Sequence, residues 1–220
     1  MKLTIPDLYD LDHTLAGDYL RQFTYPWEAL AGIGDMISAL GAALSPDEYD
    51  HPEEGVWVAR DAKVYPTAYL GAPCIIGHKT EVRPGAFIRG NALVGDSCVV
   101  GNSTELKNVI LFDNVQVPHY NYVGDSILGY KSHMGAGSIT SNVKSDKLPV
   151  VIHNEGEEIE TGRKKVGAML GDYVEVGCNS VLNPGTVIGR DASVYPTSCV
   201  RGVVPERCIY KTKGNIAVKK

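Results

Sequence analysis

The sequence lacks the hallmarks of a membrane, secreted or nucleic-acid-binding protein. It contains no apolar run of about 18 residues and no signal peptide, so we expect a cytoplasmic chain with no membrane partner. Its five cysteines are an odd number and form no CxxC pair, which argues against a disulfide framework. A formal net charge of −5 gives no basic footprint for binding nucleic acid.

The sequence instead has a strict period of six residues. A first aliphatic run consists of Val58, Val64, Leu70, Ile76, Val82, Ile88, Val94, Val100 and Leu106. A second run consists of Leu170, Val176, Leu182, Ile188, Val194 and Val200. Between them, Leu111, Val117, Val123, Leu128 and Met134 continue the pattern with one residue deleted. Self-similarity at a fixed period is the sequence signature of a solenoid.

The residues around the aliphatic column suggest how each unit folds. Small residues such as Ala62, Cys74 and Ala86 recur four places after the aliphatic ones, so each unit has one large and one small inward side chain. Glycine, Asn and Asp recur at positions where a tight turn needs a positive φ. Three such units would close a triangular coil of parallel strands, and each coil would be stable only against its neighbours.

The chain divides into an arm, a solenoid and a tail. Leu30, Ile33, Ile37, Leu40 and Leu44 recur at helical spacing and predict an amphipathic helix over about 27–44. We therefore expect a helical arm or cap over 1–55, which would cap or brace the first coil and protect its strand edges. The solenoid is expected over 56–211 and a short tail over 212–220.

The repeat is interrupted at 141–166. Two β-prone stretches, 150–152 and 158–160, flank Asn154-Glu155-Gly156-Glu157, which predicts the tip of a β-hairpin. Basic residues bracket this insertion, and long loops in compact folds are often functional. The alternative is a charged loop that only contacts solvent.

Three outward residues form the first candidate site. Arg83, Lys107 and His119 stand at or beside turns, and coil stacking is expected to bring them into one cationic and imidazole cluster. Such a cluster suits a phosphate bound near a neutral histidine that acts as general base. A lone histidine in a turn is often only a solvated surface residue, and some solenoids instead use three histidines to bind zinc. His119 and His133 do not have an evident zinc-binding spacing.

Four segments carry a family resemblance that covers roughly 56–211. They are Arg83-Pro84-Gly85-Ala86, Glu105-Leu106-Lys107, His119 to Asp125, and Gly135 to Asn142. They resemble the acetyltransferase domain of the bifunctional UDP-N-acetylglucosamine pyrophosphorylase/glucosamine-1-phosphate acetyltransferases. The stretch from Gly156 to Gly171 resembles the related archaeal sugar-1-phosphate nucleotidylyltransferase/acetyltransferases.

This resemblance implies a left-handed parallel β-helix that forms homotrimers with active sites between subunits. It implies acetyl-CoA as donor, an amino-sugar 1-phosphate as acceptor, and no metal for acetyl transfer. His119 would be the general base. The expected acceptor-binding residues are Arg83, Glu105, Lys107, Tyr122, His133, Asn142 and Lys147, with Arg83, Lys107 and Lys147 at the phosphate. Cys178, Pro196 and Lys211 would line the CoA site.

Some positions depart from the family pattern. His133 stands where the family has a sugar-binding asparagine, Cys178 replaces a serine and Pro196 replaces an alanine. The chain has no glycine-rich nucleotide loop of the GxGTRM type, so no uridylyltransferase activity is expected from it. A separate nucleotidyltransferase chain is a candidate partner.

The leading hypothesis is therefore a CoA-dependent N-acetyltransferase in UDP-N-acetylglucosamine biosynthesis, which acts on an amino-sugar phosphate or a nucleotide-linked amino sugar. A different class of function is a non-catalytic sugar-phosphate-binding or regulatory trimer that kept the fold. A third is a zinc-dependent solenoid enzyme of the carbonic anhydrase type.

Overall fold

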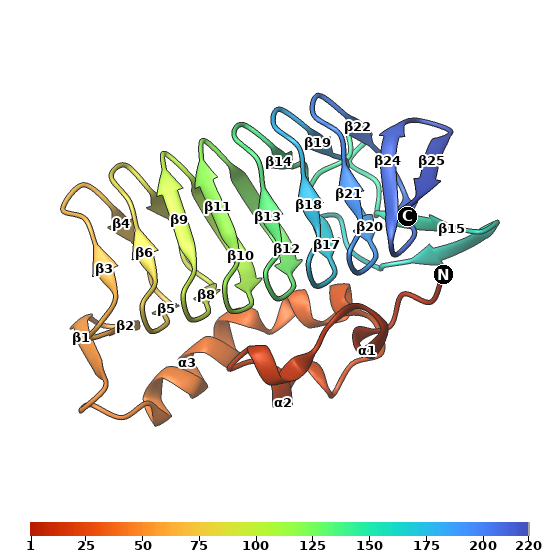
Figure 1. Ribbon diagram of the computed structural model, residues 1–220. Coiled ribbons are helices and arrows are strands. Elements are labelled where there is room, and N and C mark those ends of the chain that lie inside the picture. Colours follow the sequence, from red (N-terminus) through yellow and green to blue (C-terminus); the bar gives the residue numbers. More distant parts are fainter. Residues whose placement is uncertain (220) are drawn as a thin grey trace.

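The computed structural model describes residues 1–219 as a left-handed parallel β-helix with a helical arm along one side (Figure 1). The expected all-β solenoid is confirmed. Successive coils pair in parallel: Val58 lies opposite Ile76, and Val94 lies opposite Leu111. The second pair is one residue closer in sequence than the first, so the deleted residue in the repeat shortens a coil without shifting the inward column.

The coils have three faces, which we call the covered face, the open face and the polar face. The covered face, under the arm, consists of β2 (Val56–Ala59), β5 (Cys74–Ile76), β8 (Ala92–Val94), the ends of β10 (Glu105–Leu111) and β12 (Tyr122–Leu128), β17 (Ala168–Leu170), β20 (Thr186–Ile188) and β23 (Val203–Val204). The open face consists of β4 (Tyr69–Leu70), β7 (Phe87–Ile88), the starts of β10 and β12, β14 (Ile139–Thr140), β19 (Val181–Leu182) and β22 (Cys199–Val200).

The polar face is the third. It consists of β3 (Lys63–Val64), β6 (Glu81–Val82), β9 (Val99–Asn102), β11 (Gln116–His119), β13 (His133–Met134), β18 (Glu175–Val176), β21 (Ser193–Val194) and β24 (Cys208–Thr212). At the C-terminal end, β25 (Asn215–Val218) adds an antiparallel strand to β24. This strand covers the last edge of the polar face, which would otherwise offer unpaired backbone groups.

The aliphatic column fills the axis of the solenoid. Val82, Ile88, Val94, Val100 and Leu106 are fully buried. In the first coil, Val58, Val64 and Leu70 are only half-buried because no coil precedes them. Corners between strands repeatedly use a positive φ, as at Asn91 and Asn179. Asparagine tolerates this left-handed backbone better than most residues.

The arm lies along the covered face. It contains α1 (Ile5–Leu8), η1 (Leu11–His13), α2 (Gly17–Leu20), η2 (Pro26–Ala31) and α3 (Ile33–Ala43), and β1 (Tyr49–Glu53) joins it antiparallel to β2. The helix expected over 27–44 is therefore present as the 3₁₀-helix η2 followed by α3. Helix α3 contacts β5, β8 and β10, and η2 contacts β12. The arm thus runs along the solenoid in the opposite direction to the advancing coils (Figure 1).

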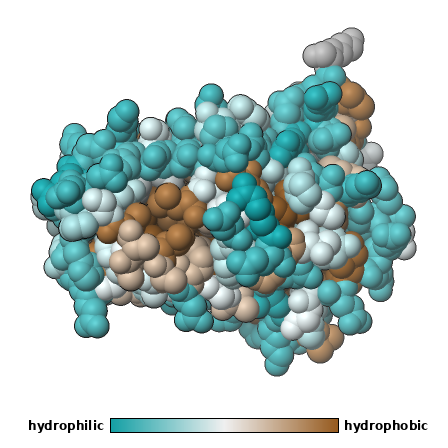
Figure 2. All heavy atoms as spheres, turned by 90° about the horizontal axis from the view of Figure 1, so that it is seen from below, coloured by the Kyte–Doolittle hydropathy of each residue, from teal (hydrophilic) through white to brown (hydrophobic). Residues whose placement is uncertain are grey.

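The arm contacts the first coil, where β1 pairs with β2, and it also extends beyond that coil, which the sequence argument did not predict. The reason is a second apolar column, which points outward from the covered face. Its members are all fully buried under the arm: Ile75, Leu93, Ile110, Ile127, Met169 and Val187. From the arm's side the surface is mostly hydrophilic, and hydrophobic residues gather mainly in one patch toward the N-terminal coils (Figure 2).

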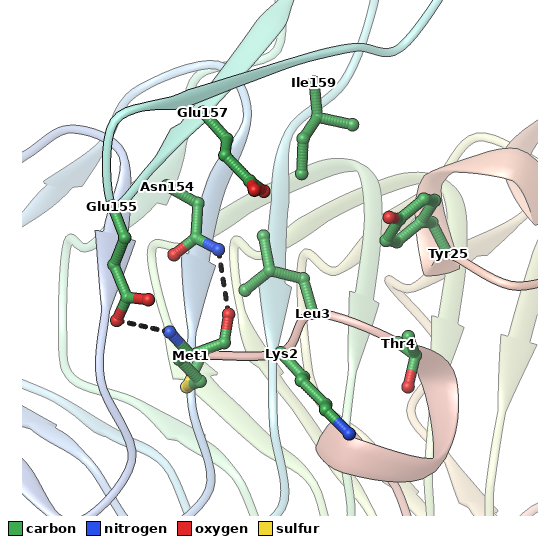
Figure 3. A pocket seen from close by; sticks show the side chains of 9 residues that line it. All are labelled: Met1, Lys2, Leu3, Thr4, Tyr25, Asn154, Glu155, Glu157 and Ile159. Atoms are coloured by element: carbon green, nitrogen blue, oxygen red, sulfur yellow. Dashed lines mark hydrogen bonds and ion pairs between the residues drawn. The ribbon is translucent and has the colours of Figure 1, made fainter.

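The insertion forms the expected hairpin, in which β15 (Val151–Asn154) pairs antiparallel with β16 (Glu157–Glu160). The hairpin contacts the start of the arm, where the Asn154 Nδ2 donates to the Met1 backbone oxygen at 2.8 Å. Figure 3 shows the cavity of about 490 Å³ between them, which Leu3 and Ile159 also line. The insertion is therefore tied to the arm as well as to the coils.

We predict that Leu93→Ala will lower the free energy of unfolding by about 2–5 kcal/mol, because it opens a cavity between β8 and the arm. The matched control is Val99→Ala, an outward position on the polar face that is only half-buried. Chemical denaturation of both variants measures the difference. Equal losses in the two variants would contradict a packed arm.

Candidate functional site

His119 stands where the polar face turns into the open face, a corner that we call the His119 edge. The side chain is exposed at the end of β11. The backbone on either side is fixed: the His119 N–H donates to Asn121 Oδ1 at 3.1 Å, and the His119 oxygen accepts from Gly137 N at 3.0 Å. Asn121 is buried, and its Nδ2 donates to the Gly135 oxygen at 2.9 Å. The imidazole therefore projects from a rigid corner.

The expected CoA-binding residues continue along the same edge. Thr197 N donates to the Cys178 oxygen at 2.8 Å, so Cys178 and Pro196 stand at corresponding corners of neighbouring coils. Lys211 lies over the ring of Tyr195 with its Nζ 6.0 Å from the centroid. Coils are about 4.8 Å apart, so these side chains form a row parallel to the solenoid axis. Such a row suits an elongated ligand.

Glycine keeps this edge narrow. A Cβ on Gly101 would lie 1.5 Å from the Pro118 oxygen, and one on Gly177 would lie 2.4 Å from Pro196 N. Both distances are far below any real Cβ contact, so only glycine permits the coils to stack here. The two glycines therefore let neighbouring coils approach closely along this edge.

Arg83 is also at the polar-to-open corner but is already paired. Its Nη2 and Nε donate to Glu81 Oε2 at 3.0 and 3.1 Å. Partial burial alone would raise the pKa of Glu81, but the hydrogen bonds and charge of Arg83 hold this pKa below its ordinary value. In the absence of a ligand, Arg83 is therefore already in an ion pair with the Glu81 carboxylate.

Lys107 stands across the open face, at the corner between the open and covered faces, which we call the Lys107 edge. Its Nζ lies 3.2 and 3.3 Å from the two carboxylate oxygens of Asp125. Asn108 Nδ2 also donates to Asp125 Oδ1, at 2.9 Å, and Asn142 Nδ2 donates to Oδ2 at 2.6 Å. Asp125 thus accepts hydrogen bonds from three residues at this edge, and its side chain is only 3 % exposed.

Tyr122 and Glu105 connect the two edges on the open face, where they are neighbours in register. Asn142 Nδ2 donates to the Tyr122 hydroxyl at 3.2 Å, and Glu105 Oε1 accepts from Arg89 at 2.8 Å. Burial raises the pKa of Tyr122, and the negative charges of Asp125 and Glu105 raise it further. The Tyr122 hydroxyl is therefore a neutral donor and acceptor at ordinary pH.

Beside the Lys107 edge is a basic cavity of about 520 Å³. It lies between the coils, η2 and the end of the insertion, and its charged lining is Lys107, Asp125, Arg163, Lys164 and Lys165. An isolated bridge between Val143 and Lys165 brings the end of the insertion back beside Asn142. The cavity thus holds four cations and one carboxylate, an arrangement that favours an anionic ligand.

The sequence argument did not assign Arg163, Lys164 or Lys165 to the site. The available signal was the run of three cations where the insertion returns to the solenoid. Their position beside Lys107 depends on the path of the hairpin, which six-residue spacing does not describe.

Two of the expected residues lie apart from both edges. His133 is on the polar face, where its Nδ1 is 2.8 Å from Glu175 Oε2. Lys147 is exposed in a turn of the insertion, closed by a hydrogen bond from its N–H to the Lys144 oxygen at 3.1 Å. The structure therefore places the expected residues on two edges and the intervening face, with His133 and Lys147 elsewhere, and not in a single cluster.

Two further features of residues 1–219 concern metals and membranes. No three His, Cys, Asp or Glu side chains in this range are grouped so that they could hold a metal ion. No helix in the same range is long and apolar enough to span a bilayer.

Comparisons with known proteins identify relatives of this chain. A family profile described as "GMPPB C-terminal domain" matches residues 70–161. A bifunctional sugar-1-phosphate nucleotidylyltransferase/acetyltransferase from Sulfurisphaera tokodaii is 32% identical over 145 residues, which are 66% of this chain and 36% of that protein. The bifunctional protein GlmU of Methanococcus maripaludis strain S2 is 30% identical over 206 residues, 92% of this chain and 50% of that protein.

Among solved structures, a hexapeptide transferase family protein from Anaplasma phagocytophilum is 10% identical, with 75% of this chain and 79% of that chain covered and a TM-score of 0.42. At that score the likeness carries no weight for function. The chain spans half or less of the length of the two curated relatives above. The resemblance seen in the motifs is confirmed: this chain is homologous to part of the bifunctional GlmU and sugar-1-phosphate nucleotidylyltransferase/acetyltransferase proteins.

Proposed function

We propose that the protein is a CoA-dependent N-acetyltransferase that acts on an amino-sugar phosphate. The observation that carries the proposal is the layout of the open face, which has an exposed imidazole at one edge and a basic cavity at the other. An acceptor that lies across this face would present its amine to His119 and its phosphate to the cavity. Glu105, Tyr122 and Asn142 would contact the sugar between them.

The basic cavity supports a phosphate rather than a neutral group at the far end of the acceptor. Arg83 and Lys107 each have a carboxylate partner, whereas Arg163, Lys164 and Lys165 take part in no ion pair among residues 1–219. A phosphate in the cavity would therefore gain charge-assisted hydrogen bonds without displacing a carboxylate from these three cations. We assign Lys107 and these three residues to the phosphate; Arg83 lies at the opposite corner, paired with Glu81, and is not assigned to it.

The chemistry needs one base and one site for the oxyanion. His119 takes a proton from the acceptor amine as the nitrogen attacks the thioester carbonyl of acetyl-CoA. The carbonyl oxygen becomes an oxyanion, which backbone N–H groups of the glycine-lined edge would stabilise. When the C–S bond breaks, the amide forms and CoA leaves as its thiolate, which then takes up a proton. Cys178, Pro196 and Lys211 would lie along the bound CoA.

His133 and Lys147 suggest how a homotrimer would complete the site. His133 lies on the polar face and cannot contribute to the open face of its own chain without crossing the solenoid. In a trimer whose threefold axis runs parallel to the solenoid axes, the polar face of one subunit can approach the open face of the next. We propose that His133 and Lys147 act on a neighbouring subunit's acceptor.

A non-catalytic sugar-phosphate-binding trimer is the alternative that the basic cavity also fits. It would bind the same acceptor but release no CoA thiol. A thiol-release assay with acetyl-CoA and a panel of amino-sugar 1-phosphates separates the two functions, since only the enzyme produces free thiol.

We predict that His119→Ala will lower the rate of thiol release at least 100-fold while the circular dichroism spectrum and oligomeric state stay unchanged. The imidazole is exposed and takes part in no hydrogen bond or ion pair among residues 1–219, so the fold should tolerate its loss. His153→Ala, an exposed histidine of the hairpin, is the matched control and should keep full activity. Unchanged turnover in His119→Ala would refute its role as the base.

We further predict that CoA will protect Cys178 from alkylation by iodoacetamide. Cys178 and Cys199 are both exposed, but only Cys178 is on the His119 edge; Cys199 is on the open face. Peptide mass spectrometry should show slower labelling of Cys178 when CoA is present and a much smaller effect at Cys199. Equal labelling rates at Cys178 with and without CoA would place the cofactor elsewhere.

A further inference from the structure

The solenoid has a first end, at the coil that begins with β2, and a last end, at β24 and β25 (Figure 1). Beyond the first coil lies a cavity of about 440 Å³, with Val58, Val64 and Leu70 in its lining. At the last end, Val218 is 75 % exposed and Ile216 is 40 % exposed. Both ends therefore leave large aliphatic side chains uncovered.

The strand β25 continues the inward column past the last coil. Residues directly opposite each other in an antiparallel pair lie on the same side of the sheet. Ile216 lies opposite Tyr210, which is buried and in register with Val194 of the inward column. Val218 lies opposite Cys208, which is also buried. Ile216 and Val218 are therefore on the axial side of the sheet, and no coil among residues 1–219 follows to cover them.

The strand edges at the two ends are complementary. On the polar face, β3 pairs only with β6 and β25 pairs only with β24, so this sheet has one free edge at each end. Because β25 runs antiparallel to β24 and to the other strands of this sheet, the two free edges can pair as antiparallel strands. Pairing Ile216 with Val64 would place Val218 opposite Ala62, a large side chain against a small one.

The shapes of the two ends also fit each other. At the first end, β1 adds a strand beyond β2 on the covered face. At the last end, β25 adds a strand beyond β24 on the polar face. When the last end of one chain meets the first end of another, these two extra strands occupy the same level on different faces. They therefore do not compete for space.

The two ends carry opposite charge. At the first end, residues 47–54 include five Asp or Glu and no Lys or Arg, whereas residues 201–219 at the last end include five Lys or Arg and one Glu. Glu53 and Arg201 both lie where the open face meets the covered face, and both are exposed. Neither takes part in an ion pair among residues 1–219. Contact between two like ends would bring like charges together, so the charges favour contact between unlike ends.

We propose that the last end of one chain binds the first end of a second copy, so that solenoids stack coaxially, head to tail. The free edge of β25 then pairs with the free edge of β3, and the inward apolar column continues from one copy into the next. Such a contact does not close on itself, so it builds open rows of copies. In a homotrimer, three of these contacts would act together. The proposal is independent of the proposed function.

Sedimentation velocity of the full chain tests the proposal. At concentrations up to about 100 μM, which reveal micromolar affinities, we expect species larger than the basal monomer or trimer, and fewer of them at high salt. Val218→Glu should weaken this association at least about tenfold, because it replaces an apolar contact by a charge that faces the acidic end. Leu148→Glu, at an exposed site in the insertion, is the matched control and should associate like the wild type. No larger species in the wild type, or equal losses in both variants, would overturn the proposal.

Mixing two variants distinguishes contact between unlike ends from contact between like ends. Glu53→Lys alters only the first end, and Val218→Glu alters only the last end. Each variant alone should remain the basal oligomer, whereas an equimolar mixture should associate, because each supplies the end that the other has lost. If either variant alone associates like the wild type, the proposal fails. Arg201→Glu, at an exposed position, repeats the test at the last end if Val218→Glu alters the circular dichroism spectrum.

Discussion

The parallel hydrogen bonding between coils, held in register by the inward aliphatic column, is the constraint on which the rest of the structure depends. Leu106, for example, pairs with Ile88 before it and Val123 after it, and is fully buried. A slip of one residue would turn this side chain outward and its neighbours inward, so the register is strongly specified. The outward residues are consequently arranged in rows, and the position of each side chain in its row is fixed by the register of its coil.

The register also determines what the arm and the insertion can do. The covered face has a continuous apolar row that must be shielded from water, and the arm shields it over several coils. The insertion leaves and re-enters the solenoid between Leu128 and Leu170, which still pair directly across neighbouring coils. The pairing between coils is thus uninterrupted by the insertion. The end of the insertion lies beside the Lys107 edge.

The sequence allowed the frame to be predicted but not the contacts of its polar side chains. Six-residue spacing identified the inward column and the deleted residue, and the β-prone stretches on either side of Asn154-Glu155-Gly156-Glu157 predicted the hairpin. It did not identify the row that includes Leu93 and Ile110, because outward apolar residues have no period of six on the other two faces. Nor did it reveal that Glu81 pairs with Arg83 or that Asp125 pairs with Lys107, since those pairs depend on side-chain geometry across a corner.

The two edges of the open face therefore differ in kind. At the His119 edge, glycines such as Gly101 allow neighbouring coils to approach closely. At the Lys107 edge, a buried carboxylate sets the direction of each neighbouring donor. Turning Asn142 around would leave two acceptors facing each other in a partly buried place, at a cost of roughly 1–3 kcal/mol. The Asn142 amide is therefore held with its NH₂ group toward Asp125 and its oxygen turned away from it.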